Sequence, residues 1–266
     1  MQNPSETISP RNTGGIARLV PWREPALVAG FLGRDGGVST GAFASMNLSE
    51  LVGDDPAHVA ENWRRLHALL APKLTFARLR QVHGNEVVVV TRGNLDHRPR
   101  ADAMVTREIG IVLGIFTADC VPVLLSAPRE RVCGAMHAGW RGVIAGIAGA
   151  GVRAMNSLGA APGSIRAALG PSIGACCFEV DRELADRFVA EIPGARRHRR
   201  EGRAGKAYLD LRAILRDQLI AAGVAPDAIE NVGPCTRCAC AQYFSRRAAG
   251  GAITGLQLSF AGFAQD

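Results

Sequence analysis

Apolar residues along the chain follow two spacings, one typical of amphipathic helices and one typical of buried strands. Between residues 56 and 70 they recur at helical spacing, at Val59, Trp63, Leu66 and Leu70. Asp55 is a favourable N-cap and Pro56 suits the first helical position, so this segment predicts a first helix. Further helices are expected at 141–158, 181–190 and 209–222. The many Ala and Gly residues of 141–158 indicate close packing against another element.

Short apolar runs bounded by Gly or polar residues predict the strands. We expect them at 26–31, 79–82, 86–90, 101–106, 109–116, 131–136, 243–245 and 255–260. Glycine-containing loops are expected at 33–39 and 170–174, and a further loop at 231–240. Strands and helices mix without strict alternation, which favours an α+β fold over a doubly wound one.

The composition indicates the cellular compartment in which the protein is expected. The chain has 266 residues, 47% of them hydrophobic, which is enough for a substantial core. No apolar run reaches the roughly 20 residues that span a bilayer. Residues 1–14 are polar, lack the apolar core of a signal peptide, and are expected to form a disordered lead. Seven cysteines and no export signal indicate reduced thiols, so we expect a cytoplasmic protein without a membrane partner.

The chain is basic, with a formal net charge of +7 at pH 7. Much of the excess lies in the arginine-rich segment 196–203. No aromatic residue interleaves these arginines, so a surface that stacks nucleic-acid bases is not expected. A solvated loop is favoured over an anion-binding patch.

One cysteine and two histidines have the pattern of a metal site with an open position. Cys120 follows the apolar run 109–116, and His83 and His137 also adjoin strand-like segments and a Gly. Zinc accepts thiolate and imidazole, and catalytic zinc sites usually keep three protein ligands. The alternative is a buried thiol with two histidines that are satisfied by hydrogen bonds. Asp119, beside Cys120, is a candidate catalytic acid.

A second set of cysteines is a rival metal motif. Cys235, Cys238 and Cys240 lie close together in sequence, and a structural zinc would need a further ligand from Cys176 or Cys177. Nothing in the sequence brings the two segments together.

Several arginines and acids are candidates for substrate contacts. Arg141 lies at the start of the predicted helix 141–158, where backbone N–H groups and the helix dipole favour an anion such as phosphate. Arg34, in the loop 33–39, and Arg246 or Arg247 are further candidates. Asp102 is the other acid expected to contact the substrate.

Taken together, the motifs resemble the laccase-domain family, also described as multicopper polyphenol oxidoreductases and as purine nucleoside phosphorylases. The matching segments are Arg34-Asp35-Gly36-Gly37-Val38-Ser39, Met46-Asn47-Leu48, Gln81-Val82-His83-Gly84, Ala101-Asp102-Ala103, Thr117-Ala118-Asp119-Cys120-Val121-Pro122, His137-Ala138-Gly139-Trp140-Arg141-Gly142, Gly170-Pro171-Ser172-Ile173-Gly174, Phe178-Glu179-Val180 and Cys235-Thr236. The resemblance covers roughly residues 26–260. It implies one catalytic domain, residues 15–266, built of mixed β-sheets flanked by helices.

The resemblance also implies a chemistry. It implies a zinc ion, or alternatively copper, held by His83, Cys120 and His137, with Asn47 among the residues that bind substrate. It implies cleavage of adenosine, inosine and methylthioadenosine by phosphate, with an adenosine deaminase side activity. The expected partners are a small nucleoside and phosphate, with no nucleic acid. The protein is expected to be a monomer.

Two positions depart from the family pattern. Asp35 stands where the family often has His, and Leu256 stands where it often has Arg, so the substrate range is in question.

Three other functions stay open. A copper-dependent polyphenol oxidase would need more histidines than the six present. A hydrolase that edits peptidoglycan precursors would use Cys120 as its nucleophile. A binding module without catalysis is disfavoured, because the polar residues converge on one metal-like site.

Overall fold

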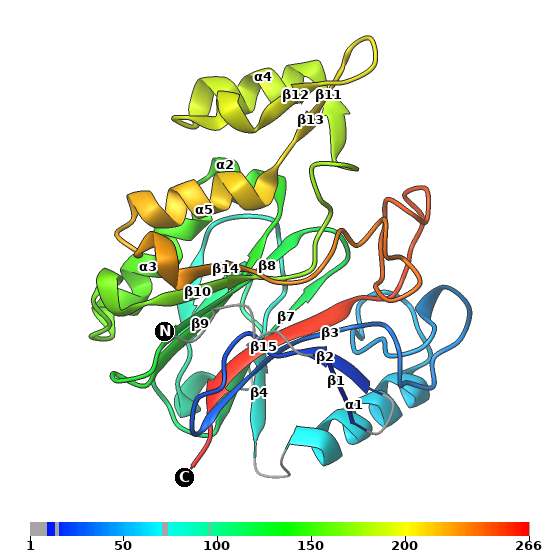
Figure 1. The fold of residues 1–266 in the computed structure, drawn as a ribbon. Helices are drawn as coiled ribbons and strands as arrows, with labels where there is room; N and C mark the ends of the chain where they lie inside the picture. The colour runs from blue at the N-terminus through cyan, green and yellow to red at the C-terminus, as the bar shows by residue number, and fades with distance from the viewer. Residues whose placement is uncertain (1–9, 14–15, 71–73, 96, 266) are drawn as a thin grey trace.

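The computed structural model describes residues 10–13, 16–70, 74–95 and 97–265. They form an α+β fold in which two mixed six-stranded sheets pack face to face and helices cover their outer faces (Figure 1). A third, three-stranded sheet with one helix lies apart from these layers, at the top of the view. The α+β class and the single domain of mixed sheets are confirmed.

The first sheet joins segments from both ends of the chain. Its strands, in spatial order, are β1 (Pro10–Thr13), β2 (Ile16–Leu19), β3 (Leu27–Leu32), β15 (Gln257–Phe263), β7 (Ile111–Thr117) and β4 (Thr75–Arg78). All neighbours are antiparallel except β4 and β7. Strand β1 overlaps the expected disordered lead 1–14, of which residues 1–9 and 14 lie outside the described residues.

The second sheet carries most of the candidate site. Its strands, in spatial order, are β14 (Ile229–Asn231), β10 (Arg166–Leu169), β8 (Val121–Ala127), β9 (Val132–Ala138), β6 (Ala103–Thr106) and β5 (Val87–Val89). The pairs β10–β14 and β5–β6 are parallel and the others antiparallel. The third sheet contains β11 (Glu179–Asp181), β13 (Lys206–Leu209) and β12 (Arg199–Glu201), all antiparallel.

Helices cover both outer faces. Helix α1 (Pro56–Leu70) packs on the first sheet, where Leu66 meets Leu258 and Phe260 in one cluster. Helices α2 (Trp140–Ile144), α3 (Ile147–Ser157) and α5 (Leu211–Ala221) cover the second sheet, and α4 (Arg182–Glu191) covers the third. Short 3₁₀ turns lie at Gly41–Phe43, Arg92–Asn94, Pro162–Ser164, Ala195–His198 and Pro226–Ala228. No helix in the described part of the chain is long and apolar enough to span a membrane.

Strand β7 explains why the sequence before Cys120 is a continuous apolar run without alternating polar residues. Leu113 and Ile115 face the core between the two sheets, whereas Val112 faces the cluster beneath α1. A strand that is buried on both faces has no polar positions to alternate with apolar ones.

The predicted helix 141–158 is wrong as a single element. Gly146 has a left-handed backbone, with φ of 78°, and separates α2 from α3. Glycine adopts this conformation without the steric cost that a side chain brings, so it breaks the helix here.

Two predicted strands, 79–82 and 243–245, are also wrong, and for the same reason. The amide of Gln81 bonds both the N–H and the C=O of Phe116, at 2.8 Å each. The amide of Gln257 likewise bonds the N–H and the C=O of Phe244. In both places a glutamine side chain takes up the backbone groups that a neighbouring strand would otherwise bond.

The arginine-rich segment 196–203 is not the expected loop. It contributes to the 3₁₀ turn Ala195–His198 and to β12. Arg197 pairs with Asp217, and Arg199 pairs with Glu201. Carboxylates therefore already neutralise part of this charge, which further disfavours an anion patch.

Candidate metal-centred active site

His83, Cys120 and His137 converge as the sequence predicts. Cys120 lies in the turn between β7 and β8, and His137 lies near the end of β9. The register pairs Pro122 with His137, which places Cys120 beside this histidine. His83 arrives from the loop between β4 and β5, and its ring centroid lies 4.7 Å from that of His137. The donor atoms of all three residues lie within 4.8 Å of one another.

Asp102 bonds both His137 and the turn that carries His83. Its fully buried carboxylate accepts a hydrogen bond from His137 Nδ1 at 2.8 Å. It also accepts the backbone N–H groups of Val82, His83 and Gly84, the last at 2.6 Å. Because an ionised carboxylate only accepts, it keeps the His137 proton on Nδ1 and leaves Nε2 for a metal. With no exposed surface, Asp102 cannot make the predicted substrate contact, and it acts instead as a positioning residue.

Two ligand-bearing turns have left-handed backbones. His83 has φ of 63°, and Asp119, next to Cys120, has φ of 90°. Non-glycine residues rarely adopt this region, and they do so where the surroundings force it. Asp102 binds the His83 turn, whereas the Asp119 carboxylate accepts the Thr236 hydroxyl at 2.6 Å and the Arg247 N–H at 2.7 Å. Asp119 thereby anchors the turn that presents Cys120.

Two glycines let a third segment approach the site. A Cβ at Gly139 would lie 2.9 Å from His83 Cδ2 and 3.3 Å from Cys120 Sγ. A Cβ at Gly142 would lie 2.6 Å from the carbonyl oxygen of Gly84. Any side chain at either position would therefore push the ligands apart. This explains on physical grounds why glycines flank Trp140 and Arg141.

The three ligands shift one another's protonation. Although burial raises the pKa of the Cys120 thiol, the charge of His137 and hydrogen bonds with both histidines lower it to about 6. Burial lowers the pKa of His137, but the Cys120 thiolate and the Asp102 carboxylate raise it overall. Cys120 is thus held as a thiolate near neutral pH, which is the form that binds a metal.

The donor set fits a single metal ion. One thiolate and two imidazoles suit zinc, and they also suit copper, so the residues by themselves do not choose between the two. His83 is exposed and Cys120 is half-buried, which leaves one side of the set open toward a cavity.

Two cavities meet at Cys120. The first, of about 520 Å³, has walls that include Leu51, Val52, Leu79 and Ile253. The second, of about 510 Å³, is lined by Asp119, Ile173, Phe178 and Arg247 among others. Ala118, Cys120 and Arg246 line both. A mostly apolar hollow with a few convergent polar groups is the usual form of a small-molecule site.

The other predicted substrate residues are mainly engaged within the protein. Arg34 bonds the carbonyls of Ala44 and Cys240, and fully buried Asn47 bonds Ser49 and Asp54. Asn47 Oδ1 also accepts the N–H of Leu256, a residue that lines the first cavity. Neither residue lines either cavity, and only Asn47 supports a wall, through Leu256.

Arg141 lies in the first turn of helix α2, as predicted, but outside both cavities at Cys120. It is exposed, and its guanidinium lies 4.3 Å from the ring centre of Trp140. Helix α2 has five residues, so its dipole is weak and gives little support to the expected phosphate site. Arg247 does line the second cavity, and its guanidinium bonds the carbonyls of Cys177 and Glu179.

Three contributions were missed or underrated from sequence. Arg246 lines both cavities, Gln81 lines the first, and Thr236 binds Asp119. Arg246 adjoins Arg247 and Gln81 lies two positions before His83, so proximity to a motif was the available signal. Thr236 lies far from Asp119 in sequence, and no local pattern links the two.

The comparison with known families gives a decisive match. The model of the family described as multi-copper polyphenol oxidoreductase laccase matches residues 28–264. This chain belongs to that family. The predicted resemblance is therefore confirmed over nearly the whole chain.

Relatives and solved structures agree with this membership. The chain is 39% identical over 246 residues to the purine nucleoside phosphorylase YlmD of Geobacillus stearothermophilus, covering 88% of this chain and 89% of that protein. It is 38% identical over 219 residues to the adenosine deaminase RL5 of an unknown prokaryotic organism, covering 79% and 84%. The crystal structure of the same YlmD superposes with a TM-score of 0.90 at 36% identity, over 97% of this chain and 99% of that one. The hypothetical protein YfiH of Bacillus licheniformis gives a TM-score of 0.87 at 29% identity, over 95% and 97%.

The family's description speaks of several coppers, but this member gathers few histidines. Within the described residues, the sets of His, Cys, Asp and Glu that could hold a metal include only two histidines, His83 and His137. His67 packs against Trp63 and Phe76, and His198 bonds Asp217. A blue copper with a trinuclear cluster would need many more imidazoles close together.

Proposed function

We propose that this protein is a zinc-dependent purine nucleoside phosphorylase. It cleaves adenosine, inosine and methylthioadenosine with phosphate, giving the free base and ribose 1-phosphate or its methylthio form, and it deaminates adenosine as a side reaction. The observation that carries the proposal is the His83–Cys120–His137 set, which opens into an apolar cavity bordered by Arg246. The names of its relatives, a purine nucleoside phosphorylase and an adenosine deaminase, support the same chemistry.

The cavity walls suit the two halves of the reaction. Leu51, Val52 and Ile253 offer an apolar surface to a flat purine ring. Arg246, where the two cavities meet, and Arg247, in the second, offer guanidinium groups suited to phosphate. Nucleoside in the first cavity and phosphate at this junction would place the phosphate oxygen beside the sugar. The departure from the family pattern at Leu256, which lines the first cavity, would then affect the choice of nucleoside.

Phosphorolysis needs positioning and charge stabilisation more than covalent help from the protein. A phosphate oxygen forms the new bond to C1′ while the bond from C1′ to the base nitrogen breaks. The electron pair of that bond leaves with the base, which takes up a proton. Holding both reactants in line supplies much of the rate enhancement. The residue that delivers the proton to the base stays unassigned.

His83, Cys120 and His137 would hold the zinc, and Asp102 would orient His137. When bound, zinc would supply a Lewis acid that stabilises negative charge on the purine and activates water for the deaminase reaction. Asp119 keeps Cys120 in place through Thr236 and the N–H of Arg247. The predicted catalytic role of Asp119 thus becomes a positioning role in this proposal. The cytoplasmic location and the monomeric state stay predictions.

One observation favours a second candidate, the cysteine hydrolase. Cys120 is a thiolate beside His137, which is also the arrangement of an activated nucleophile. The two candidates differ in what Cys120 does. As a metal ligand it controls metal content, whereas as a nucleophile it forms a covalent adduct with the substrate.

Metal analysis and nucleoside assays on one preparation test the proposal. We expect base release from adenosine to need phosphate and a zinc ion that depends on Cys120. The variant Cys120→Ser should lose that zinc, phosphorolysis and deamination in parallel, because a neutral hydroxyl is a poor replacement for thiolate. Full metal content without activity, together with an adduct trapped on the wild type, would favour the hydrolase. Copper in place of zinc, with phenol oxidation, would favour the oxidase.

A further inference from the structure

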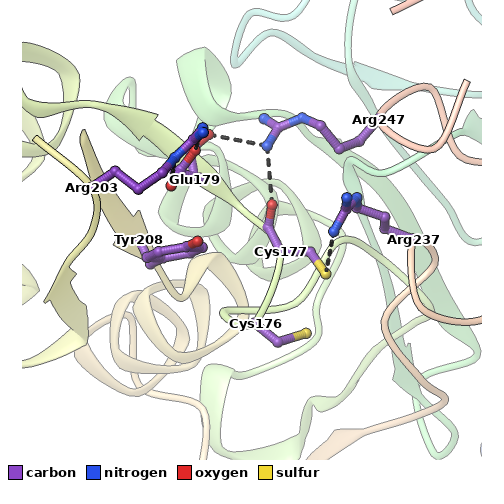
Figure 2. A pocket seen from close by; sticks show the side chains of 7 residues that line it. All are labelled: Cys176, Cys177, Glu179, Arg203, Tyr208, Arg237 and Arg247. Carbon is purple, nitrogen blue, oxygen red and sulfur yellow. Dashed lines mark hydrogen bonds and ion pairs between the residues drawn. The ribbon is translucent and has the colours of Figure 1, made fainter. Parts of the chain in front are cut away.

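A second group of four cysteines lies outside the site described above. Cys176 and Cys177 belong to the loop between β10 and β11, and Cys235 and Cys238 belong to the loop after β14. Cys176 and Cys177 line a pocket of about 360 Å³. Figure 2 shows Arg237 beside Cys177. The proposed phosphorylase reaction uses none of these thiols.

The four sulfur atoms have the spacing of a tetrahedral metal site. All four Sγ atoms lie within 4.8 Å of one another. Cys238 Sγ lies 3.4 Å from Cys177 Sγ and 3.7 Å from Cys176 Sγ. Four sulfurs at the usual zinc–sulfur distance of about 2.3 Å form a tetrahedron with edges of about 3.8 Å. The observed separations therefore surround a space for one ion, and all seven cysteines of the chain are free thiols.

The backbone around the sulfurs has features of a metal-binding loop. Cys235 and Cys238 have the C-x-x-C spacing that is common among structural zinc sites. The N–H of Gly174 donates to Cys235 Sγ at 3.2 Å, which stabilises a thiolate. A Cβ at Gly174 would lie 3.2 Å from Cys235 Cβ and 3.4 Å from Cys176 Sγ, so a side chain there would crowd the place where the two loops meet.

Positive charge lies beside the cluster. Arg237 Nη1 lies 3.5 Å from Cys177 Sγ. Arg247 Nη1 bonds the carbonyl of Cys177 at 3.0 Å (Figure 2). Four thiolates around a divalent ion carry a net negative charge, which these two guanidinium groups would offset.

We propose that Cys176, Cys177, Cys235 and Cys238 form a structural four-thiolate site for one zinc ion. The ion joins the loop between β10 and β11 to the loop after β14. Four protein ligands leave no open position, so the site is structural and not catalytic. Cys240, which follows in the same loop, is exposed and is not one of the four.

The two loops joined in this way support the turn that presents Cys120. From the first loop, Ile173 N–H donates to the carbonyl of Asp119 at 2.9 Å. From the second, the Thr236 hydroxyl donates to the Asp119 carboxylate, and its N–H donates to the Ser172 carbonyl. A zinc ion between the loops would therefore fix two groups that bond Asp119, Ile173 and Thr236, in addition to the N–H of Arg247. It would thereby add stability to the active-site turn without contacting the substrate, while the Arg247 N–H still holds Asp119 when that zinc is absent.

Zinc content per chain tests the proposal directly. The protein is purified under reducing conditions without added metal, and zinc is measured for the wild type, Cys238→Ser and Cys120→Ser. We expect Cys238→Ser to lose one zinc per chain while keeping the ion that depends on Cys120. Cys240→Ser is the matched control, because it removes an exposed thiol from the same loop and should keep all the zinc. An unchanged zinc content in Cys238→Ser would overturn the proposal.

X-ray absorption on the wild type gives a second measurement that does not depend on a variant folding. In protein whose Cys120 site has been emptied by a mild chelator, the remaining zinc should show sulfur ligands alone, at about 2.3 Å. Nitrogen or oxygen ligands on that zinc would overturn the proposal. So would a disulfide among the four cysteines in freshly purified, reduced protein.

These outcomes are independent of the nucleoside reaction. If the Cys120 site proves to hold copper or to have no phosphorylase activity, the zinc lost in Cys238→Ser is still measured separately. Conversely, an active phosphorylase with one zinc per chain, all of it dependent on Cys120, would leave the proposed function standing and refute the four-thiolate site.

Discussion

Replacing Asp102 by Asn changes one atom and should disable the metal site. The two side chains have nearly the same shape, but the amide offers one acceptor where the carboxylate offers two. Asp102 Oδ1 accepts from His137 Nδ1 and from the N–H of His83, whereas Oδ2 accepts from the N–H of Gly84 at 2.6 Å. Whichever way the amide turns, its NH₂ group meets a donor.

The two orientations have different consequences. With NH₂ in place of Oδ2, the Gly84 N–H is buried opposite another donor, and the His83–Gly84 turn loses its partner. With NH₂ in place of Oδ1, His137 is driven to the tautomer that carries its proton on Nε2, which then cannot bind a metal.

The size of the effect follows from these losses. A buried donor without a partner costs on the order of 1–3 kcal/mol in the free energy of unfolding. Loss of the carboxylate that orients a metal-binding histidine typically weakens metal affinity by about 10–100-fold. We expect both losses together, with phosphorolysis falling in proportion to bound metal and recovering at high zinc concentration.

Competition with a chromophoric chelator measures the zinc affinity, and urea unfolding of the metal-free protein measures stability. Asp217→Asn is the matched control, because it alters another Asp–His pair, with His198, and neither residue lines a cavity at Cys120. That variant should keep its zinc affinity. If Asp102→Asn lost stability but kept the affinity of the wild type, Asp102 would be a purely structural residue, and its role in orienting His137 toward the metal would be refuted.

The same geometry makes three further predictions. Gly139→Ala should lower zinc occupancy while circular dichroism stays that of the wild type, since its Cβ would crowd His83 and Cys120; normal zinc content would contradict this. Arg246→Ala should raise the KM for phosphate by about 10–100-fold, as expected for loss of a charged hydrogen bond of about 1.5–3 kcal/mol, whereas Arg141→Ala should leave it unchanged. In chelator-treated protein, alkylation of Cys120 should stay fast as the pH falls to about 6, because its lowered pKa keeps the thiolate present above that value. A decline already near the pKa of an ordinary thiol, about 8.5, would contradict the pairing of Cys120 with the histidines.

Local pattern was enough to find the helical segments, some of the strands and the three ligands. The sequence predicts the bounds of helix α1 (Pro56–Leu70), since Asp55 bonds the N–H of Ala57 and the apolar face is complete. Strand β7 was recognisable because both its faces are buried. Cys120 and His137 each lie in a short motif at the end of a strand, and His83 lies in a short motif in the loop between β4 and β5. The chemistry of these residue types predicted a shared metal before their convergence was known.

Contacts between distant segments decided the rest, because no local spacing encodes them. Asp102 has the sequence context of a substrate-binding acid, yet burial behind His137 gives it the task of holding a ligand. Gln81 and Gln257 replace strand neighbours only because each side chain meets a backbone from elsewhere in the fold. The thiols at 176–177 and 235–238 are separated by about a fifth of the chain. The sequence contains the four cysteines of a metal site, but only the pairing of β10 with β8 and β14, which aligns the two loops, brings their sulfur atoms into one tetrahedron.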